Sequence, residues 1–491
     1  MADVGLQLGI VTAYLVIALA VGLLAYRLTD RTAEDYYLAS RTLGTVVLLF
    51  TTFATLLSAF TFFGGPNISA GAGPEWILVM GVMDGVIFAV LWYVIGYKQW
   101  LLGQREGYLT LGEMLGDRFG STVLRVLVAV VSIFWLFPYV MLQQQGAGTA
   151  LVALTEGAVP YWVGAGGITL FMIVYVTLAG MRGVAWTDTL QGLFMLVMVW
   201  GAFVWVLVAV GGPTTATSKL ASTNPEFLKL GGGLYSPQYV ISTAVSIAFG
   251  VAMFPQVNQR FFVAESKTVL KRTFALWPVL VILLFVPAFM LGAWAAGFGI
   301  SPSDGNVLPL LLNEFTPGWF AALVVAGAMA AMMSSSDSML LSGSSYLTRD
   351  VYRQVVSTAT QRREDLLARI GVALFAVLTF VASLFQPGTL VEIGETAFGG
   401  FAQLTLPVIV ALYWAKTTRR GMLAGVFGSQ TFYLASVFTS TVPSTYLGGW
   451  SASVVGMLLG LVLTVGVSLV TTAAPGENAS RFSDLQGVEA D

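Results

Sequence analysis

About thirteen apolar stretches, each long enough to cross a bilayer as a helix, follow one another along the chain. Inside a bilayer every backbone N–H and C=O group must find its partner within the protein, so each stretch is expected to be helical. The predicted helices cover residues 5–26, 44–70, 75–97, 122–151, 160–180, 187–210, 238–259, 273–299, 317–346, 367–386, 394–415, 421–439 and 451–472.

Composition supports this prediction and excludes several kinds of chemistry. Of 491 residues, 57% are hydrophobic and 10% charged, whereas about 25% are charged in a soluble domain. Cys and His are absent, which excludes disulfides, thiolate chemistry and imidazole metal sites. No Lys follows a Gly, so the phosphate-binding loop of ATP-driven proteins is missing. We expect an all-α polytopic membrane protein whose surroundings are the lipid bilayer, with no nucleic-acid or protein partner.

Basic residues are concentrated in alternate connections between the predicted helices. With the N-terminus outside, all of the 23 Lys and Arg except Lys219 and Lys229 lie in connections on the cytoplasmic side. Connections on that side of a membrane protein carry an excess of Lys and Arg. We therefore predict a multi-pass protein of the cell membrane with its N-terminus outside and its C-terminus in the cytoplasm.

Two of the predicted helices contain Gly and Pro where a membrane helix is expected to be continuous. The second carries FGGPN at residues 63–67, and the seventh carries GVAMFPQ at residues 250–256. Interrupted helices at matching places in two halves are typical of transporters built from inverted repeats. We expect two inverted five-helix repeats, in the order 1–43 (leading helix and loop), 44–210 (first repeat), 211–237 (outer loop), 238–415 (second repeat), 416–472 (two peripheral helices) and 473–491 (disordered cytoplasmic tail).

The ninth predicted helix carries a polar stripe. Ser334, Asp337, Ser338, Ser342 and Ser345 lie on one face at helical spacing. A carboxyl group and several hydroxyls at membrane depth must face the bundle interior, where such groups usually mark an ion or substrate path. Serines also pack between helices for structural reasons alone, but the Asp favours a function for this face.

Neutral oxygens with at most one carboxylate suit a monovalent cation that must bind and then leave. Ser334 and Ser335 offer hydroxyls, and Ala331 offers a carbonyl if its helix partner turns to the ion. The interrupted second helix offers opposing carbonyls near Ala54 and Leu57. Sodium, a hard cation, prefers such oxygens, so Na⁺ is the predicted bound ion.

Four stretches resemble the sodium/solute symporter family. They are DYYLASRTLG at residues 35–44, LTLGE at 109–113 followed by RFG at 118–120, GMRGVAWTDTLQ at 180–191, and AAMMSS at 330–335 continuing to DVY at 350–352. The resemblance implies two inverted five-helix repeats, as in the bacterial leucine transporter, with one helix before them and two after.

The resemblance also assigns site residues. It implies a sodium site at Ala54, Leu57, Ala331, Ser334 and Ser335. It implies that Asp188 is an inner carboxylate on the path by which sodium leaves, and Asp337 is a second candidate on this path. Proline carriers of the family have an Asp where this chain has Leu56, so here the second helix offers sodium only backbone oxygens.

The substrate site is expected beside the two interruptions. Its predicted residues are Gly64, Gly65, Pro66, Gln144, Met253, Phe254 and Gln403. Asp84 could bind a substrate amine, or could pair with Lys98 or a hydroxyl. The stretches at residues 249–255 and 397–400 look like the pantothenate and monocarboxylate branch of the family, so the predicted solute is a small organic anion such as a monocarboxylate or pantothenate, or an amino acid.

Three functions compete at this point. The first is sodium-coupled symport by alternating access. The second is proton-coupled symport on the same fold, with Asp337 or Asp188 carrying the proton. The third is a membrane sensor or channel with a transporter fold. An enzyme is not expected, because no nucleophile and base occur at reactive spacing.

Overall fold

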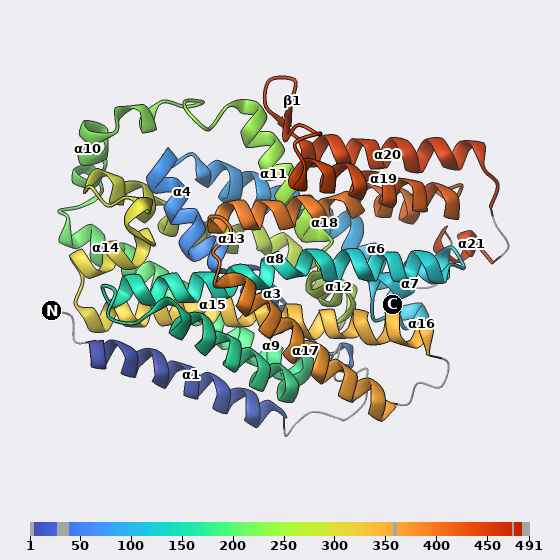
Figure 1. Ribbon diagram of the computed structural model, residues 1–491, viewed down its shortest axis with the longest axis horizontal. Coiled ribbons are helices and arrows are strands. Elements are labelled where there is room, and N and C mark those ends of the chain that lie inside the picture. Colours follow the sequence, from blue (N-terminus) through green and yellow to red (C-terminus); the bar gives the residue numbers. More distant parts are fainter. Residues whose placement is uncertain (1–3, 27–38, 357–360, 474–475, 484–491) are drawn as a thin grey trace.

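The computed structural model describes residues 4–26, 39–356, 361–473 and 476–483. Its helices run side by side, mostly lengthwise, in one elongated bundle (Figure 1). In the described part of the chain the only strands form a short hairpin, β1 (Thr445–Tyr446) and β2 (Trp450–Ser451). The all-helical membrane architecture expected from the sequence is confirmed.

The long helices and the broken ones are bounded as follows. They are α1 (Val4–Tyr26), α3 (Thr45–Leu56), η2 (Phe60–Gly64), α4 (Gly65–Ala72), η3 (Ile77–Asp84), α5 (Gly85–Leu91), η4 (Trp92–Gly96), α6 (Tyr97–Glu106), α8 (Thr122–Leu154), α9 (Tyr161–Ala209), α11 (Pro237–Ala252), α12 (Pro255–Phe262), α13 (Lys267–Gly297), α15 (Gly318–Ser345), α17 (Gln361–Ser383), α18 (Leu390–Tyr413), α19 (Arg419–Phe438) and α20 (Ala452–Val470). Shorter helical elements in the connections are η1 (Ala39–Arg41), α7 (Leu111–Arg118), α10 (Pro213–Thr223), η5 (Pro225–Leu228), η6 (Pro302–Asp304), α14 (Val307–Phe315), η7 (Tyr346–Tyr352), α16 (Arg353–Val355) and α21 (Ala479–Ser483).

Membrane-spanning helices can be counted within the described residues. Ten are long and apolar enough to cross, or up to twelve if each of two bent pairs is one span, and the stretch Tyr161–Thr177 is a shorter apolar helix. This is compatible with the thirteen predicted. The label α9 (Tyr161–Ala209) covers two apolar helical parts, Tyr161–Thr177 and Val184–Ala209. The hydroxyls of Tyr175 and Thr187, twelve residues apart, are hydrogen-bonded to each other, so the chain folds back between the two parts.

The first interruption lies earlier in the chain than predicted. The axis bends by 62° between Thr45–Leu56 and Phe60–Ala72, and Leu57 is extended with φ −79° and ψ 130°. Residues 63–67, where we expected the break, are helical. Pro66 lies where the π-helical turn η2 passes into α4, and a local π-helical adjustment of this kind lets a membrane helix continue past a residue that has no N–H to donate.

The glycines beside Pro66, which we expected to interrupt the helix, allow close packing between helices. A Cβ on Gly65 would lie 2.0 Å from the Phe289 ring, and one on Gly292 would lie 2.3 Å from the carbonyl oxygen of Pro66. Small residues let membrane helices approach each other closely. The Gly-Gly-Pro stretch thus fixes α4 against α13.

The second interruption occurs where the sequence predicts it. The axis bends by 57° between Pro237–Ala252 and Pro255–Phe262. Met253 and Phe254 leave the helix, and Pro255 begins α12. Pro255 favours the break because its nitrogen cannot donate a hydrogen bond back into α11, and as the first residue of α12 it loses no helical bond.

Helix α15 lies inside the bundle. In the membrane span Gly318–Val355, which contains α15, 83% of an apolar 18-residue stretch is buried inside the protein, a larger share than in any other described span. It packs against α3, α8, α9 and α12. The polar stripe on α15 therefore faces other helices and not lipid, as the sequence indicates.

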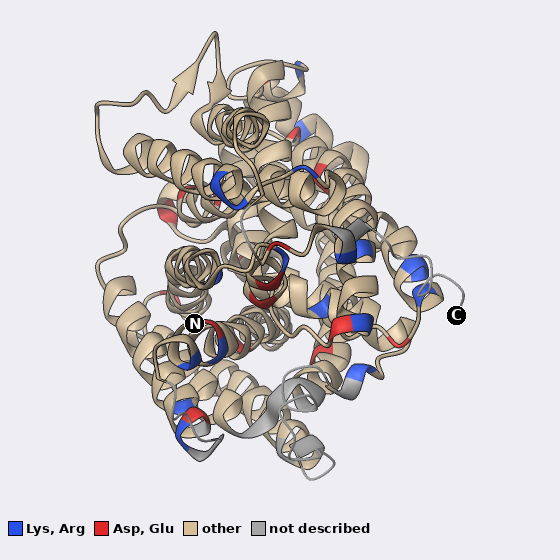
Figure 2. Cartoon of the chain, turned by 90° about the vertical axis from the view of Figure 1, so that its right-hand side faces the viewer, with Lys and Arg blue, Asp and Glu red and all other residues tan. Residues whose placement is uncertain are grey.

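One end of the bundle carries many charged residues and a docked part of the predicted tail. Figure 2 looks onto this end and shows Lys and Arg on several loops and helix ends. Within the predicted tail, the Asn478 amide donates to the carbonyl of Arg118 at 2.9 Å, and Phe482 is 2% exposed. Residues 476–483 thus pack against α7. Of the first family stretch, residues 35–38 lie outside the described residues.

We predict that Gly292→Ala destabilises the protein by about 1–3 kcal/mol, because the new methyl group would overlap the Pro66 backbone. The measurement is the free energy of unfolding in mixed micelles. Gly167→Ala is the matched control, since Gly167 also lies in a helix but has open space around it. A loss no larger than in the control would contradict the packing role.

Candidate cation site and central aromatic cluster

The break in α3 leaves backbone carbonyls without helical partners, and α15 supplies hydroxyls to them. Ser334 Oγ donates to the carbonyl of Ala54 at 2.7 Å and also lies 3.0 Å from that of Ala331. Ser335 Oγ lies 2.5 Å from the carbonyl oxygen of Leu57, and 2.9 Å from that of Thr55. The structure thus brings together all five residues predicted for the sodium site.

The backbone N–H groups after the same break are hydrogen-bonded to side chains of α8 and of the break itself. The Ala59 amide donates to Gln143 Oε1 at 2.9 Å, and the Gln143 side chain donates to the carbonyl of Tyr139 at 3.0 Å. The Phe60 amide donates to Ser58 Oγ at 3.2 Å. The break is therefore a fixed feature, stabilised from two neighbouring helices. Our sequence prediction chose Gln144 and missed the role of its neighbour Gln143.

The oxygens at this crossing fit a monovalent hard cation. Carbonyl and hydroxyl oxygens converge there from α3 and α15, and such neutral oxygens are the ligands that hard cations prefer. In the structure the Ser334 and Ser335 hydroxyls donate hydrogen bonds to the carbonyls. A bound cation would replace these hydrogen bonds, because the hydroxyl and carbonyl oxygens would then all point toward the ion.

A buried ion pair lies one helical turn further along the stripe. Arg260 Nη2 of α12 lies 3.2 Å from Asp188 Oδ2 of α9. The same nitrogen lies 2.6 Å from Ser338 Oγ and 2.8 Å from Thr55 Oγ1, and Thr51 Oγ1 donates to Asp188 Oδ2 at 2.6 Å. Four helices thus meet around one arginine.

Arg260 is a residue beside this site that our sequence reasoning missed. We counted it among the basic residues of a connection, but it is fully buried. The available signal was its place on the polar helix that follows Pro255, four residues after Gln256 and so on the same face. Asp337, the other predicted ion-path residue, is 2% exposed, and its Oδ1 has no hydrogen-bond partner among the described residues.

Most of the predicted substrate residues serve packing or interhelical bonds. Gly64 and Gly65 pack against α18 and α13. Gln144 Nε2 donates to Thr169 Oγ1 and to the carbonyl of Ala376, at 3.0 and 2.9 Å. Gln403 Nε2 donates to backbone carbonyls of α18 and α20. Gly64, Gly65, Gln144 and Gln403 thus each contact a neighbouring helix.

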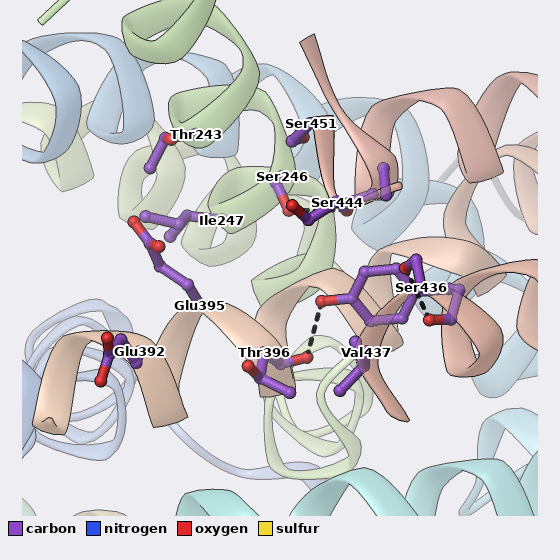
Figure 3. A pocket seen from close by; sticks show the side chains of 13 residues that line it. Thr243, Ser246, Ile247, Glu392, Glu395, Thr396, Ser436, Val437, Ser444 and Ser451 are labelled. Atoms are coloured by element: carbon purple, nitrogen blue, oxygen red, sulfur yellow. Dashed lines mark hydrogen bonds between the residues drawn. The ribbon is translucent and has the colours of Figure 1, made fainter. Parts of the chain in front are cut away.

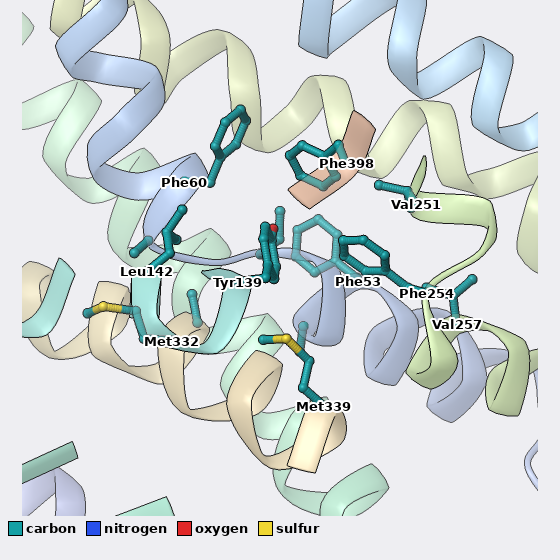
Figure 4. Packing of buried hydrophobic residues seen from close by; sticks show 14 of the residues in the cluster. Phe53, Phe60, Tyr139, Leu142, Val251, Phe254, Val257, Met332, Met339 and Phe398 are labelled. Atoms are coloured by element: carbon teal, nitrogen blue, oxygen red, sulfur yellow. The ribbon is translucent and has the colours of Figure 1, made fainter. Parts of the chain in front are cut away.

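Aromatic side chains fill the space between the two breaks (Figure 4). Phe254, next to Met253 at the second break, stacks on Phe398 with ring centroids 5.5 Å apart. Tyr139 lies 5.1 Å from Phe254, and Phe60 lies 5.2 Å from Phe398. We call Phe60, Tyr139, Phe254 and Phe398 the central aromatic cluster. Of its members, the sequence analysis singled out Phe254.

A polar cavity of about 340 Å³ lies between α11, α18, α19 and the segment around the β-hairpin (Figure 3). Ser246, Glu395 and Thr396 line it. Tyr239 donates a hydrogen bond to Glu395 Oε1 at 3.2 Å, and Tyr433 donates to the carbonyl of Thr396 at 3.1 Å. The cavity is separate from the serine crossing, since no residue of the crossing lines it.

Glu113 and Asp350, from the predicted family stretches, form a network with Arg125 and Arg349 at the charged end of the bundle. Arg125 lies 3.0 Å from Glu113 and 2.6 Å from Asp350, and Arg349 lies 2.7 Å from Glu113. The network ties α7 and α8 to η7, which continues α15. It is structural in character, because each of these carboxylates pairs with at least one arginine.

Sequence comparisons identify relatives over most of the chain. The model of the family described as "Sodium:solute symporter family" matches residues 36–428. The sodium/pantothenate symporter of Escherichia coli (strain K12) is 27% identical, with 89% of this chain and 91% of that protein covered. The sodium/proline symporter of Haemophilus influenzae is 28% identical, with 86% of each chain covered.

Solved structures share the fold. A Na⁺-coupled sialic acid symporter in a substrate-bound outward-open state matches with a TM-score of 0.80, at 19% identity, over 96% of this chain and 98% of that one. MhsT in complex with L-phenylalanine matches with a TM-score of 0.54, at 14% identity, over 86% and 98%.

We predict that Arg260→Met destabilises the protein by about 3–5 kcal/mol, because it leaves the Asp188 carboxylate buried without its counter-charge. The double variant Arg260→Met with Asp188→Leu should lose less, since neither charge then remains. Unfolding of both variants in mixed micelles gives the two free energies. A double variant that is the less stable of the two would contradict the pairing.

Proposed function

Because this chain belongs to the sodium:solute symporter family, we propose that it imports a small organic solute together with sodium by alternating access. We further propose that the ion binds where α3 and α15 cross, at the Ala54, Leu57 and Ala331 carbonyls and the Ser334 and Ser335 hydroxyls. The observation that carries this proposal is the contact of both hydroxyls with carbonyls freed by the break in α3.

The position of this crossing explains how an ion would act on the whole protein. Helix α3 lies in the first predicted repeat and α15 in the second, so an ion between them bonds both halves. A ligand shifts a conformational equilibrium only through its different affinity for the two states. Sodium bound from outside would favour the outward-open state, because it bonds α3 to α15. Its release to the cytoplasm would allow the two predicted repeats to move relative to each other.

The proposed orientation places the N-terminus outside and the charged end of the bundle in the cytoplasm. The Lys and Arg distribution supports it. In this orientation the crossing lies between the outer half-helices α4 and α11 and the inner helices α3 and α12. Asp188 and Arg260 then lie on the cytoplasmic side of the crossing, where an ion that leaves inward would pass.

The solute is proposed to bind beside the two breaks. Curated relatives are named as symporters of pantothenate and of proline, which supports a small organic acid or an amino acid. In this chain Met253 and Phe254 lie at the second break, and the central aromatic cluster forms the wall there. Gly64 and Gly65 pack against other helices, so for contact with the solute we propose Phe60 and Tyr139 in place of Gly64, Gly65 and Pro66.

We predict that Ser334→Ala with Ser335→Ala removes the rise in melting temperature that sodium causes in the purified protein, because two ion ligands are lost. Affinity for sodium should fall on the order of tenfold or more. Ser336→Ala is the matched control, since this neighbouring hydroxyl is bonded to the carbonyl of Met332 in its own helix at 2.6 Å. The rise is measured against a buffer in which potassium replaces sodium. A double variant that sodium stabilises as much as it stabilises the unchanged protein would refute the site.

Proton coupling is the second candidate, because Asp337 Oδ1 is buried without a partner among the described residues. We predict that proteoliposomes take up a solute, tested with radiolabelled pantothenate, proline and propionate, when a sodium gradient is applied. A pH gradient in sodium-free buffer should give no uptake. Asp337→Asn should retain sodium-driven uptake. Uptake driven by pH alone, and lost in Asp337→Asn, would support the proton carrier instead.

A further inference from the structure

Helix α14 is tied to α4 by a pair of reciprocal hydrogen bonds. Asn67 Nδ2 of α4 donates to Asn306 Oδ1 at 3.0 Å, and the backbone N–H of Val307 donates to Asn67 Oδ1 at 2.9 Å. Asn306 Nδ2 in turn donates to Thr149 Oγ1 of α8 at 2.8 Å. We call Asn67, Asn306 and Thr149 the amide latch. It joins three helices at the end of the bundle opposite the charged end (Figure 1).

The amide latch takes the place of the usual cap of a helix N-terminus. Asn306 is the N-cap residue of α14, and Asn at this position commonly accepts a hydrogen bond from an N–H in the first turn of its own helix. In this structure the Asn306 side chain caps nothing in α14. Asn67 instead accepts from Val307, the first residue of α14. The N-terminus of α14 is thus capped by another helix.

The same groups have a second arrangement available. If α4 moves away, the Asn306 side chain is free to turn back and accept from the N–H of Leu308, the second residue of α14. Pro309, the third residue, has no N–H that needs a partner. Opening the latch therefore exchanges one cap for another and does not leave the helix end bare. Two alternative caps of this kind make a two-state element.

The chain around the latch allows the two helices to separate. Gly305, directly before Asn306, has φ 138°, a conformation that residues with a side chain rarely adopt. It lies between η6, which follows α13, and α14. Helix α4 is closely packed on α13, where Gly292 contacts Pro66. A rotation at Gly305 therefore moves α14 away from α4 while α4 and α13 stay together.

The centre of the protein is closed to solvent in this structure. Phe60, Tyr139 and Phe254 of the central aromatic cluster are each at most 2% exposed. Phe60 lies on η2, which leads directly into α4. A solute that arrives from outside reaches the cluster only after outer helices separate, and a movement of α4 away from α14 and α8 also moves one wall of the cluster.

We propose that the amide latch holds the outer side of the protein closed, and that the cap of α14 passes from Asn67 to Asn306 when this side opens. The proposal rests on the proposed function, because it assigns the latch to the outward-facing step of transport. Asn67 and Asn306 then set the balance between the closed and the outward-open states without touching the ion or the solute. Sodium at the crossing acts against the latch, because its binding favours the outward-open state.

Asn306→Ser tests the cap exchange. Serine caps a helix about as well as Asn, but its side chain is too short to bridge Asn67 and Thr149, so the variant should favour the open state. Val251→Cys adds the only thiol of the chain at a position that is 7% exposed and packed at the centre (Figure 4). In intact cells, a membrane-impermeant methanethiosulfonate added outside should modify this thiol on the order of tenfold faster in Asn306→Ser. An unchanged rate would overturn the proposal.

Asn313→Ser is the matched control. Asn313 lies in the same helix and donates to the carbonyls of Ala153 and Leu154 of α8, at 3.0 and 3.1 Å. Its replacement removes bonds from α14 to α8 but none to α4, so the thiol at position 251 should react at the rate of the unchanged protein. An equal acceleration in Asn313→Ser and Asn306→Ser would show loosened packing only, and would also overturn the latch.

Sodium affinity separates the latch from a loss of stability. A larger population of the state that binds the ion raises the apparent affinity, whereas a packing defect leaves it unchanged. We expect Asn306→Ser to lower the sodium concentration that gives half of the full rise in melting temperature, on the order of tenfold. Asn67→Ala, which leaves Asn306 free to cap its own helix, should do the same and replaces Asn306→Ser if that variant does not fold.

The two measurements distinguish failure of the latch from failure of the proposed function. Unchanged sodium concentrations in both Asn306→Ser and Asn67→Ala would overturn the latch and leave sodium symport intact. If sodium stabilises neither these variants nor the unchanged protein, while both variants still speed modification of the thiol at position 251, sodium coupling is refuted and the latch is supported.

Discussion

The contact between the hydroxyls of α15 and the carbonyls of the broken α3 is the interaction on which the rest of the structure depends. A helix that ends inside a membrane has carbonyls that water cannot satisfy. Ser334 and Ser335 satisfy them from across the interface between the two predicted repeats. The same atoms can therefore hold the two halves together or hold a cation between them, which makes this crossing a suitable place for coupling.

Buried charge is distributed unequally around this crossing. Asp188 and Arg260 neutralise each other and are surrounded by the hydroxyls of Thr51, Thr55 and Ser338. Asp84 Oδ1 and Asp337 Oδ1, in contrast, have no hydrogen-bond partner among the described residues. Full pairing is what a structural ion pair needs, because each unpaired charge in a low-dielectric interior is costly.

The two breaks show why some features could be located from sequence and others not. Pro255 begins α12 and cannot donate a hydrogen bond back into α11, which favours a break at this place, and this effect is local. The break at Leu57 contains no Pro or Gly in residues 56–59. It depends on Gln143 and Ser335, which are distant in sequence and take the place of the lost helical bonds. The Gly-Gly-Pro stretch that suggested a break instead fits against Phe289 and Gly292.

The sequence by itself determined the membrane class, the approximate spans and the polar face of α15, because hydropathy and helical periodicity are local properties. The five residues of the candidate cation site came from the resemblance to the sodium/solute symporter family. Only the tertiary structure decided which polar groups are paired. It placed Arg260 beside Asp188, gave Gln144 and Gln403 interhelical hydrogen bonds, and left Asp84 Oδ1 without a hydrogen-bond partner among the described residues. These outcomes depend on which helices become neighbours, and no local pattern contains that information.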